Sequence, residues 1–443
     1  MHRLFQPAVL LALFAGALLS ANAQETLRGV SPHPEAMLNE FERSFAAWMS
    51  EAHDRSVKIE WLDQGGTSNI KRFIQSEFQR SPDGINVDLF FGGGVDSYIE
   101  FAEKELFEPH VLPKELLEQI GEKIAGVPVY DEKGRWYGVA LSGFGMMYNN
   151  LMVRRFKLPT VATWEDMTDP RLVGRIAAAD PRNSGSAHMV YEIILQAYGW
   201  KRGWQILHEI GGNVKQFTEG ASDVPGEVAR GSVFYGPVID FYAYAQIAKA
   251  GEDKLTYIMP EGLSVINPDP IAILKGAPNM ELAKLFVEHC LSPEGQKLLI
   301  LPKGDPEGPR NETLARLSVL PKLYAETDGR AVVKSNPFEI QNAIEYNPDI
   351  GGARWTLVND LFGALIIDAH KDLSSSWKAV GKGTQTARLK LGEMPINEEE
   401  AAELAKSWND PDYALTRKRT VSEWRQFARE KYNAAKRLNK RTP

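Results

Sequence analysis

Apolar and polar positions along the first hundred residues follow a repeated unit of strand, loop and helix. Apolar runs at 27–30, 57–62 and 87–91 each end in a loop of small or polar residues. Predicted helices follow all three runs, at 36–52, 70–79 and 97–104. Three successive β-loop-α units predict parallel strands joined by right-handed crossovers. Sheets of this kind bind ligands at the carboxyl ends of their strands, where these loops fall.

The same pattern returns in the middle of the chain. Residues 176–179 predict a short strand, and apolar residues at i, i+3, i+4 and i+7 from Val190 predict a helix. The polar loop 183–186 therefore lies at a helix N-terminus, where unpaired N–H groups and partial positive charge suit a phosphate or carboxylate. A second loop of this kind, 218–222, precedes another predicted helix. An ordinary helix cap is the alternative interpretation of the first loop.

The last part of the chain, from about residue 305, is predicted to be mostly helical. Its segment 354–370 is strongly apolar, and we expect it to be buried. The end of the chain, 417–443, is basic and carries an apolar stripe at helical spacing. This pattern fits a helix docked on an acidic body, since a single apolar stripe usually packs. A helix lying on a membrane surface is the alternative.

The N-terminus has the pattern of a secretory signal peptide. A short basic start precedes an apolar run at 8–19, and Ala21-Asn22-Ala23 has the A-x-A form of a cleavage site. The run is shorter than the ~20 residues that a membrane span needs. We therefore expect cleavage after Ala23 and a mature protein in the periplasm. Position 24 is not a cysteine, so we expect no lipid anchor there.

Charge and cysteine content exclude several classes of protein. The 443 residues have a formal net charge of −7, and removing Arg3 with the leader gives −7 − 1 = −8, which argues against a nucleic-acid binder. Cys290 is the only cysteine, so an internal disulfide and a thiolate metal cluster are excluded. The chain contains no G-x-S-x-G, H-E-x-x-H or P-loop motif. We predict that the protein is not an enzyme, with no catalytic residue and no cofactor.

Five segments, taken together, resemble one family. They are VDLFFGGGVDSYIEFAEKELFEP at 87–109, YNN at 148–150, TWEDMTDPRLVGRIAAADPRNSGSA at 163–187, QFTEGASDVPGEVARGS at 216–232 and NPDPIAILKGAPN at 267–279. Their order and spacing resemble those of the periplasmic solute-binding proteins of ABC importers. The similarity is greatest to the group (family 1) that includes ferric-ion, phosphonate and sugar-phosphate binders.

The resemblance implies the type II periplasmic binding protein fold, an α/β fold of two lobes that close on a ligand about a hinge. It assigns 24–137 and 267–304 to the first lobe and 138–266 to the second. The mostly helical extension, 305–443, is longer than usual for the family, and we expect it to pack on the first lobe. The implied partners are a small anionic solute and an ABC permease and ATPase, with no nucleic acid, and we expect a monomer. A periplasmic sensor module that reuses the fold is an alternative.

The family's ferric binders typically use a histidine in the first loop, a glutamate in the third loop and two adjacent tyrosines. In this sequence His33 fits, but residues 92–94 are all glycine and the tyrosine pair appears as Phe241-Tyr242. Too few hard anionic oxygens remain for Fe³⁺. We therefore expect no metal and a small organic anion, a phosphate or phosphonate ester before a carboxylate. A ferric ion or ferric chelate bound by His33 and Tyr242 is the alternative.

We expect the ligand to contact glycines, which expose N–H groups, and hydroxyl-bearing residues, which donate to anion oxygens. The predicted residues are Gly65, Thr67, Ser68, Gly93, Gly94 and Ser142 in and near the first lobe, and Asn183, Ser184, Gly185, Ser186, Thr218, Ser222, Tyr235 and Tyr242 in the second. Asp240 or Asp269 could pair with an ammonium group of an aminophosphonate. Asp269 could equally stabilise only its own proline-rich turn.

Overall fold

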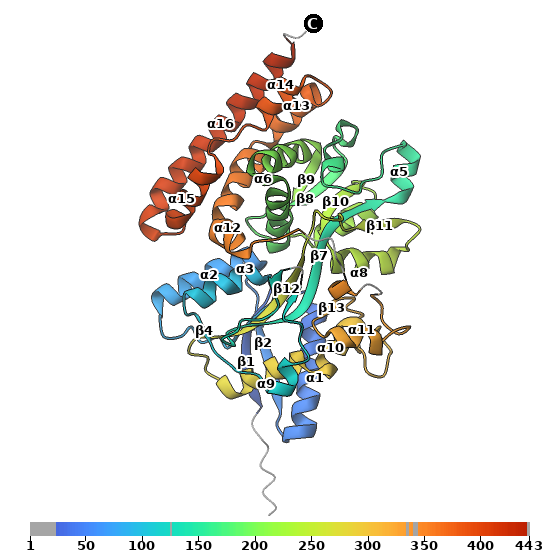
Figure 1. Ribbon diagram of the computed structural model, residues 1–443, viewed down its shortest axis with the longest axis vertical. Helices are drawn as coiled ribbons and strands as arrows, with labels where there is room; N and C mark the ends of the chain where they lie inside the picture. The colour runs from blue at the N-terminus through green and yellow to red at the C-terminus, as the bar shows by residue number, and fades with distance from the viewer. Residues whose placement is uncertain (1–23, 125, 334–335, 340–343, 441–443) are drawn as a thin grey trace, which may run out of the picture.

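The computed structural model describes residues 24–124, 126–333, 336–339 and 344–440. The predicted signal peptide, 1–23, lies outside these ranges. The described chain forms two α/β lobes, one above the other, with a set of C-terminal helices beside the upper lobe (Figure 1). None of the helices in these ranges has both the length and the hydropathy needed to cross a lipid bilayer.

Three β-loop-α units build the first lobe, as the sequence pattern predicts. They are β1 (Glu25–Val30), α1 (Glu35–His53), β2 (Val57–Leu62), α2 (Thr67–Arg80), β3 (Leu89–Phe91) and α3 (Val95–Glu103). β1 is central and pairs in parallel with β2 and β3. α2 begins three residues earlier than the apolar periodicity indicates, so Thr67 and Ser68 belong to its first turn.

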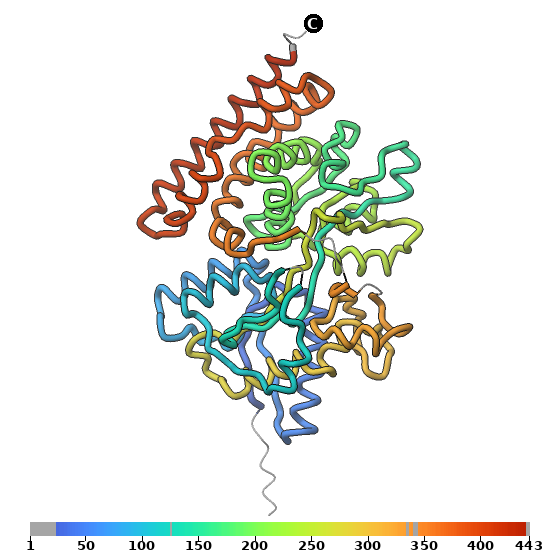
Figure 2. Tube along the Cα trace, viewed as in Figure 1, coloured from blue at the N-terminus to red at the C-terminus, as the bar shows by residue number. Residues whose placement is uncertain are grey.

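Two long strands run from one lobe into the other. β7 (Tyr137–Asn149) and β12 (Ile266–Leu274) are antiparallel, and the register shifts between Asp269 and Pro270. β12 also pairs with β3 in the first lobe, and β7 pairs with β10 in the second. One sheet of order β2-β1-β3-β12-β7-β10-β8-β9 therefore passes through both lobes, and the crossing strands can be followed in Figure 2.

The second lobe repeats the layered arrangement around the upper half of this sheet. Its elements are α5 (Asn150–Phe156), β8 (Ile176–Ala179), α6 (Gly185–Asn213), β9 (Val214–Thr218), α7 (Asp223–Ala229), β10 (Tyr235–Ile239), α8 (Asp240–Ala250) and β11 (Leu255–Ile258), with 3-10 turns at Glu165–Thr168 and Pro170–Leu172. α6 bends at Gly199, whose φ of 75° departs from helical geometry. The predicted strand and helix on either side of the loop 183–186 are both present.

The chain returns to the first lobe after β12. The elements of this return are α9 (Met280–Leu291), α10 (Pro293–Ile300), β13 (Leu317–Ser318) and α11 (Pro321–Glu326). The short elements β4 (Phe107–Glu108), α4 (Lys114–Leu117), β5 (Lys123–Ile124) and β6 (Val127–Pro128) come earlier, between α3 and β7. Cys290 lies in α9 and is fully buried as a free thiol, as expected of a small hydrophobe. β13 pairs with β7 and packs on α10, so the beginning of the extension lies against α10 of the first lobe.

The later helices of the extension lie between the lobes or beside the second lobe. They are α12 (Pro348–Phe362), α13 (His370–Val380), α14 (Gln385–Leu391), α15 (Glu398–Trp408) and α16 (Ala414–Lys440), with a π-helical turn at Gly363–Ile367 and 3-10 turns at Pro337–Glu339 and Pro411–Tyr413. α13 and α14 pack on α6 of the second lobe (Figure 1). The prediction that the whole extension packs on the first lobe is therefore wrong for these helices.

Two glycines of α6 explain where the extension docks. A Cβ on Gly212 would lie 2.4 Å from the Trp377 ring, and one on Gly211 would lie 2.6 Å from Ile366. Trp377 is fully buried, and its Nε1 donates to Asn213 Oδ1 at 2.6 Å. The flat surface that these glycines leave on α6 therefore receives the largest apolar side chain of α13.

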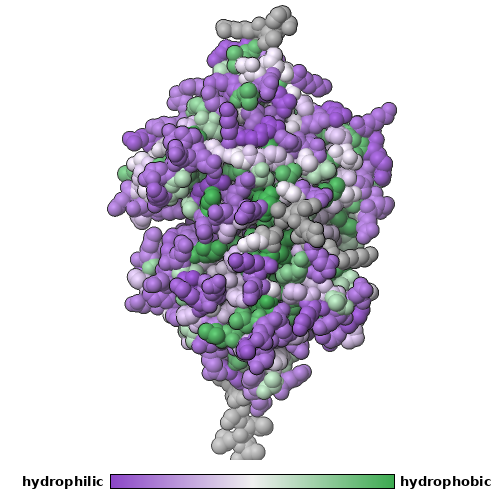
Figure 3. Space-filling model, viewed as in Figure 1, coloured by the Kyte–Doolittle hydropathy of each residue, from purple (hydrophilic) through white to green (hydrophobic). Residues whose placement is uncertain are grey.

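The basic terminal helix is docked rather than free, which confirms the first interpretation of its apolar stripe. Trp424, Ala428, Tyr432 and Ala435 are buried, and α16 packs on α13 and α14. Its arginines meet carboxylates of the helices beneath, such as Arg425 with Asp368, Arg417 with Asp360 and Arg429 with Asp372. On the face seen in Figure 3, apolar residues gather near the middle, between the lobes, and hydrophilic residues cover most of the rest.

α12 lies between the two lobes and contacts both. The Trp355 ring stacks on His188 of α6 at 3.7 Å, and its Nε1 donates to Ser68 Oγ of α2 at 3.2 Å. Lys71 Nζ lies 4.8 Å from the same ring. Arg354, next to Trp355, pairs with the fully buried carboxylate of Glu192 on α6 at 2.7 Å. α12 thus ties helices of the first lobe to the main helix of the second.

The buried indole of Trp355 predicts a large stability cost for Trp355→Ala. We expect a loss of about 3–5 kcal/mol in the free energy of unfolding, because the truncation leaves a cavity between the lobes. Urea denaturation of residues 24–443 measures it. The control is Leu415→Ala, at a side chain that is 80% exposed on α16, for which we expect a change within about 0.5 kcal/mol. Equal small changes in both variants would show that α12 does not hold the lobes together.

Candidate functional site

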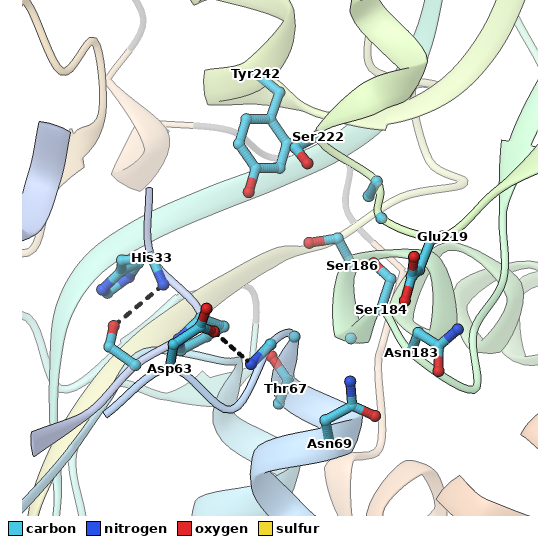
Figure 4. A pocket seen from close by; sticks show the side chains of 17 residues that line it. His33, Asp63, Thr67, Asn69, Asn183, Ser184, Ser186, Glu219, Ser222 and Tyr242 are labelled. Carbon is cyan, nitrogen blue, oxygen red and sulfur yellow. Dashed lines mark hydrogen bonds between the residues drawn. The ribbon is translucent and has the colours of Figure 1, made fainter. Parts of the chain in front are cut away.

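A cavity of about 340 Å³ lies between the lobes at the carboxyl ends of the sheet strands. Its lining residues are Ser31, Pro32, His33, Asp63, Gly65, Gly66, Thr67, Asn69, Asn183, Ser184, Gly185, Ser186, Glu219, Gly220, Ala221, Ser222 and Tyr242. Figure 4 shows first-lobe side chains, such as Thr67 and Asn69, on one side and Ser184, Ser186 and Ser222 of the second lobe on the other. The cavity is therefore shared by both lobes.

Two long helices begin at this cavity. α2 begins at Thr67 behind Gly66, and α6 begins at Gly185 behind Ser184. Ser184 caps α6, with its Oγ accepting from Ala187 N at 3.3 Å. The first N–H groups of each helix have no partner in their own helix, and both helix ends carry partial positive charge. The cavity therefore offers donors from both lobes to a bound oxygen.

The lobes touch beside the cavity, and small residues permit the contact. A Cβ on Gly66 would lie 2.2 Å from the Asn183 carbonyl oxygen, and one on Gly185 would lie 2.6 Å from Thr67 Cβ. Ser68 Oγ donates to the Pro181 carbonyl at 3.0 Å. The start of α2 thus rests directly on the loop before α6, and the two helix ends lie close to each other.

The charge of the cavity lining is unusual for an anion site. No lysine or arginine lines it, while the exposed carboxylates of Asp63 and Glu219 do. Asp63 accepts from Gly65 N at 2.9 Å and so stabilises its own loop. Glu219 extends the polar lining on the second-lobe side (Figure 4). Backbone N–H groups and hydroxyls would have to meet an anionic group, while Glu219 suits a hydroxyl or ammonium group.

A smaller cavity of about 50 Å³ adjoins the first. Asp269 of β12 lines it and accepts several hydrogen bonds there. Asp269 Oδ1 accepts from Gly94 N at 3.3 Å and from Gly93 N. Its Oδ2 contacts His33 Nε2 and Arg316 Nη1, each at 2.8 Å. The N–H groups of Gly93 and Gly94, which the sequence analysis assigned to a ligand, are therefore bonded to a carboxylate of the chain itself in this structure.

Burial and charge set the protonation of this cluster. Burial would raise the pKa of the Asp269 carboxyl, but the hydrogen bonds and charges of His33 and Arg316 lower it well below its usual range. Burial lowers the pKa of His33 against the pull of Asp269, which favours the neutral imidazole at pH 7. Arg316, whose guanidinium also lies 3.6 Å from the Phe241 ring, is then the cation that balances Asp269.

The predicted residues fall into three groups. Those lining the main cavity are Gly65, Thr67, Asn183, Ser184, Gly185, Ser186, Ser222 and Tyr242. Gly93, Gly94 and Ser142 line the smaller cavity, where Ser142 Oγ is buried without a hydrogen-bond partner among the described residues.

Ser68, Thr218 and Tyr235 line neither cavity. Ser68 is bonded to Pro181 and Trp355. Thr218 Oγ1 donates to the Gly220 carbonyl at 2.8 Å. Tyr235 is fully buried and donates to the Pro159 carbonyl at 2.8 Å.

Several cavity residues escaped the sequence analysis. Ser31, Asp63, Asn69 and Glu219 line the main cavity, and Arg316 lines the smaller one. The first four adjoin loops that the β-loop-α pattern had already placed at the sheet edge, so that pattern could have found them. Arg316 lies beyond residue 305, in the part of the chain for which the resemblance gave no guide.

The side chains present do not favour the ferric alternative. His33 is already paired with Asp269, and burial raises the pKa of Tyr242 to about 12, so its phenol is neutral at pH 7. Across the described ranges, no three or more His, Cys, Asp or Glu side chains are grouped so as to hold a metal ion. Asp240 is also unavailable as an ion-pair partner for a ligand, since it accepts from Gly143 N and Phe241 N.

Comparisons with known proteins agree with this architecture. A family model described as bacterial extracellular solute-binding protein matches residues 85–304. An uncharacterised protein of Haemophilus influenzae is 31% identical over 247 residues, which cover 55% of this chain and 67% of that protein. The chain belongs to the family of bacterial extracellular solute-binding proteins. Members of this family bind solutes and are not enzymes, in agreement with the sequence prediction.

Other relatives of this solute-binding protein have more specific names. The phosphoglycerate transport regulatory protein PgtC of Salmonella typhimurium is 33% identical over 161 residues, which cover 36% of this chain and only 40% of the relative. Among solved structures, the periplasmic binding protein AfuA of Actinobacillus pleuropneumoniae, with fructose 6-phosphate bound, has a TM-score of 0.60 at 20% identity, covering 80% of this chain and 98% of its own.

Iron-bound HitA of Pseudomonas aeruginosa is similar to the same degree. Its TM-score is 0.56 at 18% identity, covering 79% of this chain and 99% of its own. At these identities the structural neighbours establish the fold alone. That fold is the predicted one, two lobes of the periplasmic binding protein type with a helical C-terminal region.

The Asp269 cluster predicts a pH-dependent stability difference for Asp269→Asn. The variant leaves Arg316 buried without its carboxylate, which we expect to cost about 3–5 kcal/mol at pH 7. Because the folded-state pKa of Asp269 lies below its unfolded value of about 3.9, its stabilisation is present above that pH and is lost as the pH falls further. The gap between wild type and variant should therefore narrow below about pH 4.

Urea denaturation at pH 7, 5 and 3.5 measures the gap. Asp412→Asn, at an exposed position of the extension, is the matched control, with an expected change within about 0.5 kcal/mol. A gap between wild type and Asp269→Asn that is equally small at all three pH values would contradict the role of this carboxylate.

Proposed function

We propose that this protein is the extracytoplasmic solute-binding component of an ABC importer. In this proposal it works in the periplasm as a monomer, after removal of residues 1–23. It captures a small organic anion in the cavity between its lobes and presents it to a membrane permease and its ATPase. Family membership supports the binding role. The importer partners and the location follow from the kind of family.

The proposed ligand is a phosphate or phosphonate ester, with a carboxylate as second choice. One observation supports this choice above all, the meeting of the α2 and α6 N-termini at a cavity rich in hydroxyls. Helix N-termini bind phosphate oxygens through N–H groups and partial positive charge. The names of two relatives, which refer to phosphoglycerate and fructose 6-phosphate, point to the same class of ligand.

The cavity also suggests what the rest of the ligand looks like. With no lysine or arginine in the lining, hydrogen bonds rather than ion pairs would orient the phosphoryl group. Glu219 and Asn69 would accept from or donate to polar groups on the carbon skeleton. A polyhydroxylated or amino-bearing phosphate ester fits this lining better than inorganic phosphate or a hydrophobic acid.

The crossing strands supply the expected means of closure. β7 and β12 are the continuous connections that join the sheets of the two lobes, and their register shifts at Asp269. In this proposal the lobes rotate about these strands when the ligand enters, as hinged binding proteins do. In this proposal the close approaches of Gly66 to Asn183 and of Gly185 to Thr67 are among the contacts that hold the lobes together when the ligand is bound.

Calorimetry of residues 24–443 with 3-phosphoglycerate, fructose 6-phosphate, 2-aminoethylphosphonate, citrate, ferric citrate and Fe³⁺ tests the ligand class. We expect at least one phosphoryl compound to bind. We also expect Ser184→Ala with Ser186→Ala to weaken it at least tenfold, about 1.4 kcal/mol, because two hydroxyls at the start of α6 are lost.

The control pair is Ser375→Ala with Ser422→Ala, both exposed on the extension, which should leave affinity unchanged. Tight binding of Fe³⁺ alone, with a tyrosinate charge-transfer band, would favour the ferric alternative. Unchanged affinity in the Ser184/Ser186 variant would move the ligand site away from the start of α6.

A further inference from the structure

A second cavity, of about 420 Å³, lies along α2, whereas the first lies at the start of that helix. It is bounded by α2 of the first lobe, the loop before α6 of the second lobe, and α12 and α16 of the extension. Trp355, which ties the lobes together, forms part of its wall. Three parts of the chain that are far apart in sequence therefore meet around one cavity.

The lining of this cavity is strongly basic. Lys71, Arg72, Arg182 and Arg417 line it, and Asp360 is the single carboxylate among its lining residues. The mature chain as a whole has a negative formal charge, and the main cavity contains no lysine or arginine. The overall composition of the chain therefore does not account for a cluster of cations at this cavity.

Most of these cations are held in place by carboxylates. Arg182 pairs with Asp180 at 2.7 Å and with Asp368 at 3.1 Å. Arg417 Nε pairs with Asp360 at 2.7 Å. These pairs fix the positions of the guanidinium groups, and Arg417 presents its charge to the cavity from the side of the extension.

Arg72 differs from the others. Its Nη1 donates to the Arg182 carbonyl at 2.9 Å and its Nη2 donates to Asn69 Oδ1. It forms no ion pair with any carboxylate in the described part of the chain. Burial and then the nearby charge of Arg417 lower the pKa of Arg72, against the opposing charges of Asp360 and Asp180. Both Arg72 and Arg417 line the cavity, and like charges repel. An anion between them would relieve this repulsion.

We propose that this cavity is a second solute site, which binds a multivalent oxyanion of the phosphate type between Arg72, Arg182 and Arg417. Guanidinium groups bind such anions through paired N–H donors, and three of them converge here. Each arginine belongs to a different part of the chain: α2, the loop before α6, and α16. A bound anion therefore bridges both lobes and the extension and stabilises their present arrangement. The site does not depend on the proposed function of the main cavity.

Inorganic phosphate is the probe, because it needs no organic skeleton for recognition. We expect calorimetry on residues 24–443 to show phosphate binding that Arg72→Gln weakens at least tenfold. Arg80→Gln is the matched control, since Arg80 lies on the same helix, is ion-paired with Glu77 and does not line the cavity. Phosphate binding that is lost in the Ser184→Ala, Ser186→Ala double variant but kept in Arg72→Gln would place the phosphate in the main cavity instead, which separates the two sites.

Three results would overturn the proposal: no phosphate binding by wild type up to about 10 mM, equal weakening by Arg72→Gln and Arg80→Gln, or weakening only in the Ser184/Ser186 variant. A crystal of the wild-type protein soaked in arsenate gives a reading that does not depend on any variant. An anomalous peak within hydrogen-bonding distance of the Arg72 guanidinium supports the site. A peak at the start of α6 with none at Arg72 overturns it.

Discussion

The architecture of the binding region depends on the carboxylate of Asp269. It lies on a crossing strand, at the bulge where β12 passes between the lobes, and it accepts from the glycine N–H groups after β3. In open α/β sheets that edge is where ligands usually bind. Here the chain supplies its own anion, balanced by Arg316, so the donors at α3 are already used. The main cavity lies beside this cluster, at the starts of α2 and α6.

The two places differ in the charge that they would present to a ligand. A site at the Asp269 cluster would bring a permanent cation, Arg316, close to the ligand. Among the described residues the lining of the main cavity has no such cation, so in the proposed function its selectivity comes from directed hydrogen bonds. Directed donors favour a ligand of defined shape, whereas a cationic pocket accepts many anions. The two cavities beside α2 differ in this respect, since the lining of one is neutral to acidic and that of the other is basic.

The sequence predicts the fold well where the information is local. Apolar periodicity locates the three β-loop-α units and the start of α6, and the loop 183–186 does line the cavity. It fails where a partner lies far away in the chain. Gly93 looks like a free donor until Asp269, 176 residues later, is seen beside it. Ser68 looks like a ligand contact until Trp355, 287 residues later, is found against it.

The same reason explains the error about the extension. The apolar stripe of α16 predicts that this helix packs against the protein, but the local sequence does not indicate against which surface. Gly211 and Gly212 of α6 determine where α13, which lies beneath α16, docks on the second lobe, because they leave the flat patch that Ile366 and Trp377 fill. From sequence alone, a glycine in a helix interior indicates only a less stable helix, because its packing partner is not known. Long-range steric complementarity is therefore the part of the structure that a single sequence does not display.

α2 contacts both the second lobe and the extension. Its first turn rests on the loop before α6, its Ser68 bonds to the Trp355 indole of the extension, and Arg72 one turn later holds the Arg182 carbonyl. Any separation of the lobes must break the contacts of α2 with the second lobe, and either those with α12 or those of α12 with α6. Under the two proposals above, a ligand at either cavity would strengthen contacts of this helix, and by linkage each would favour the arrangement that the other requires. The extension would then give a second place from which closure of the two lobes is biased.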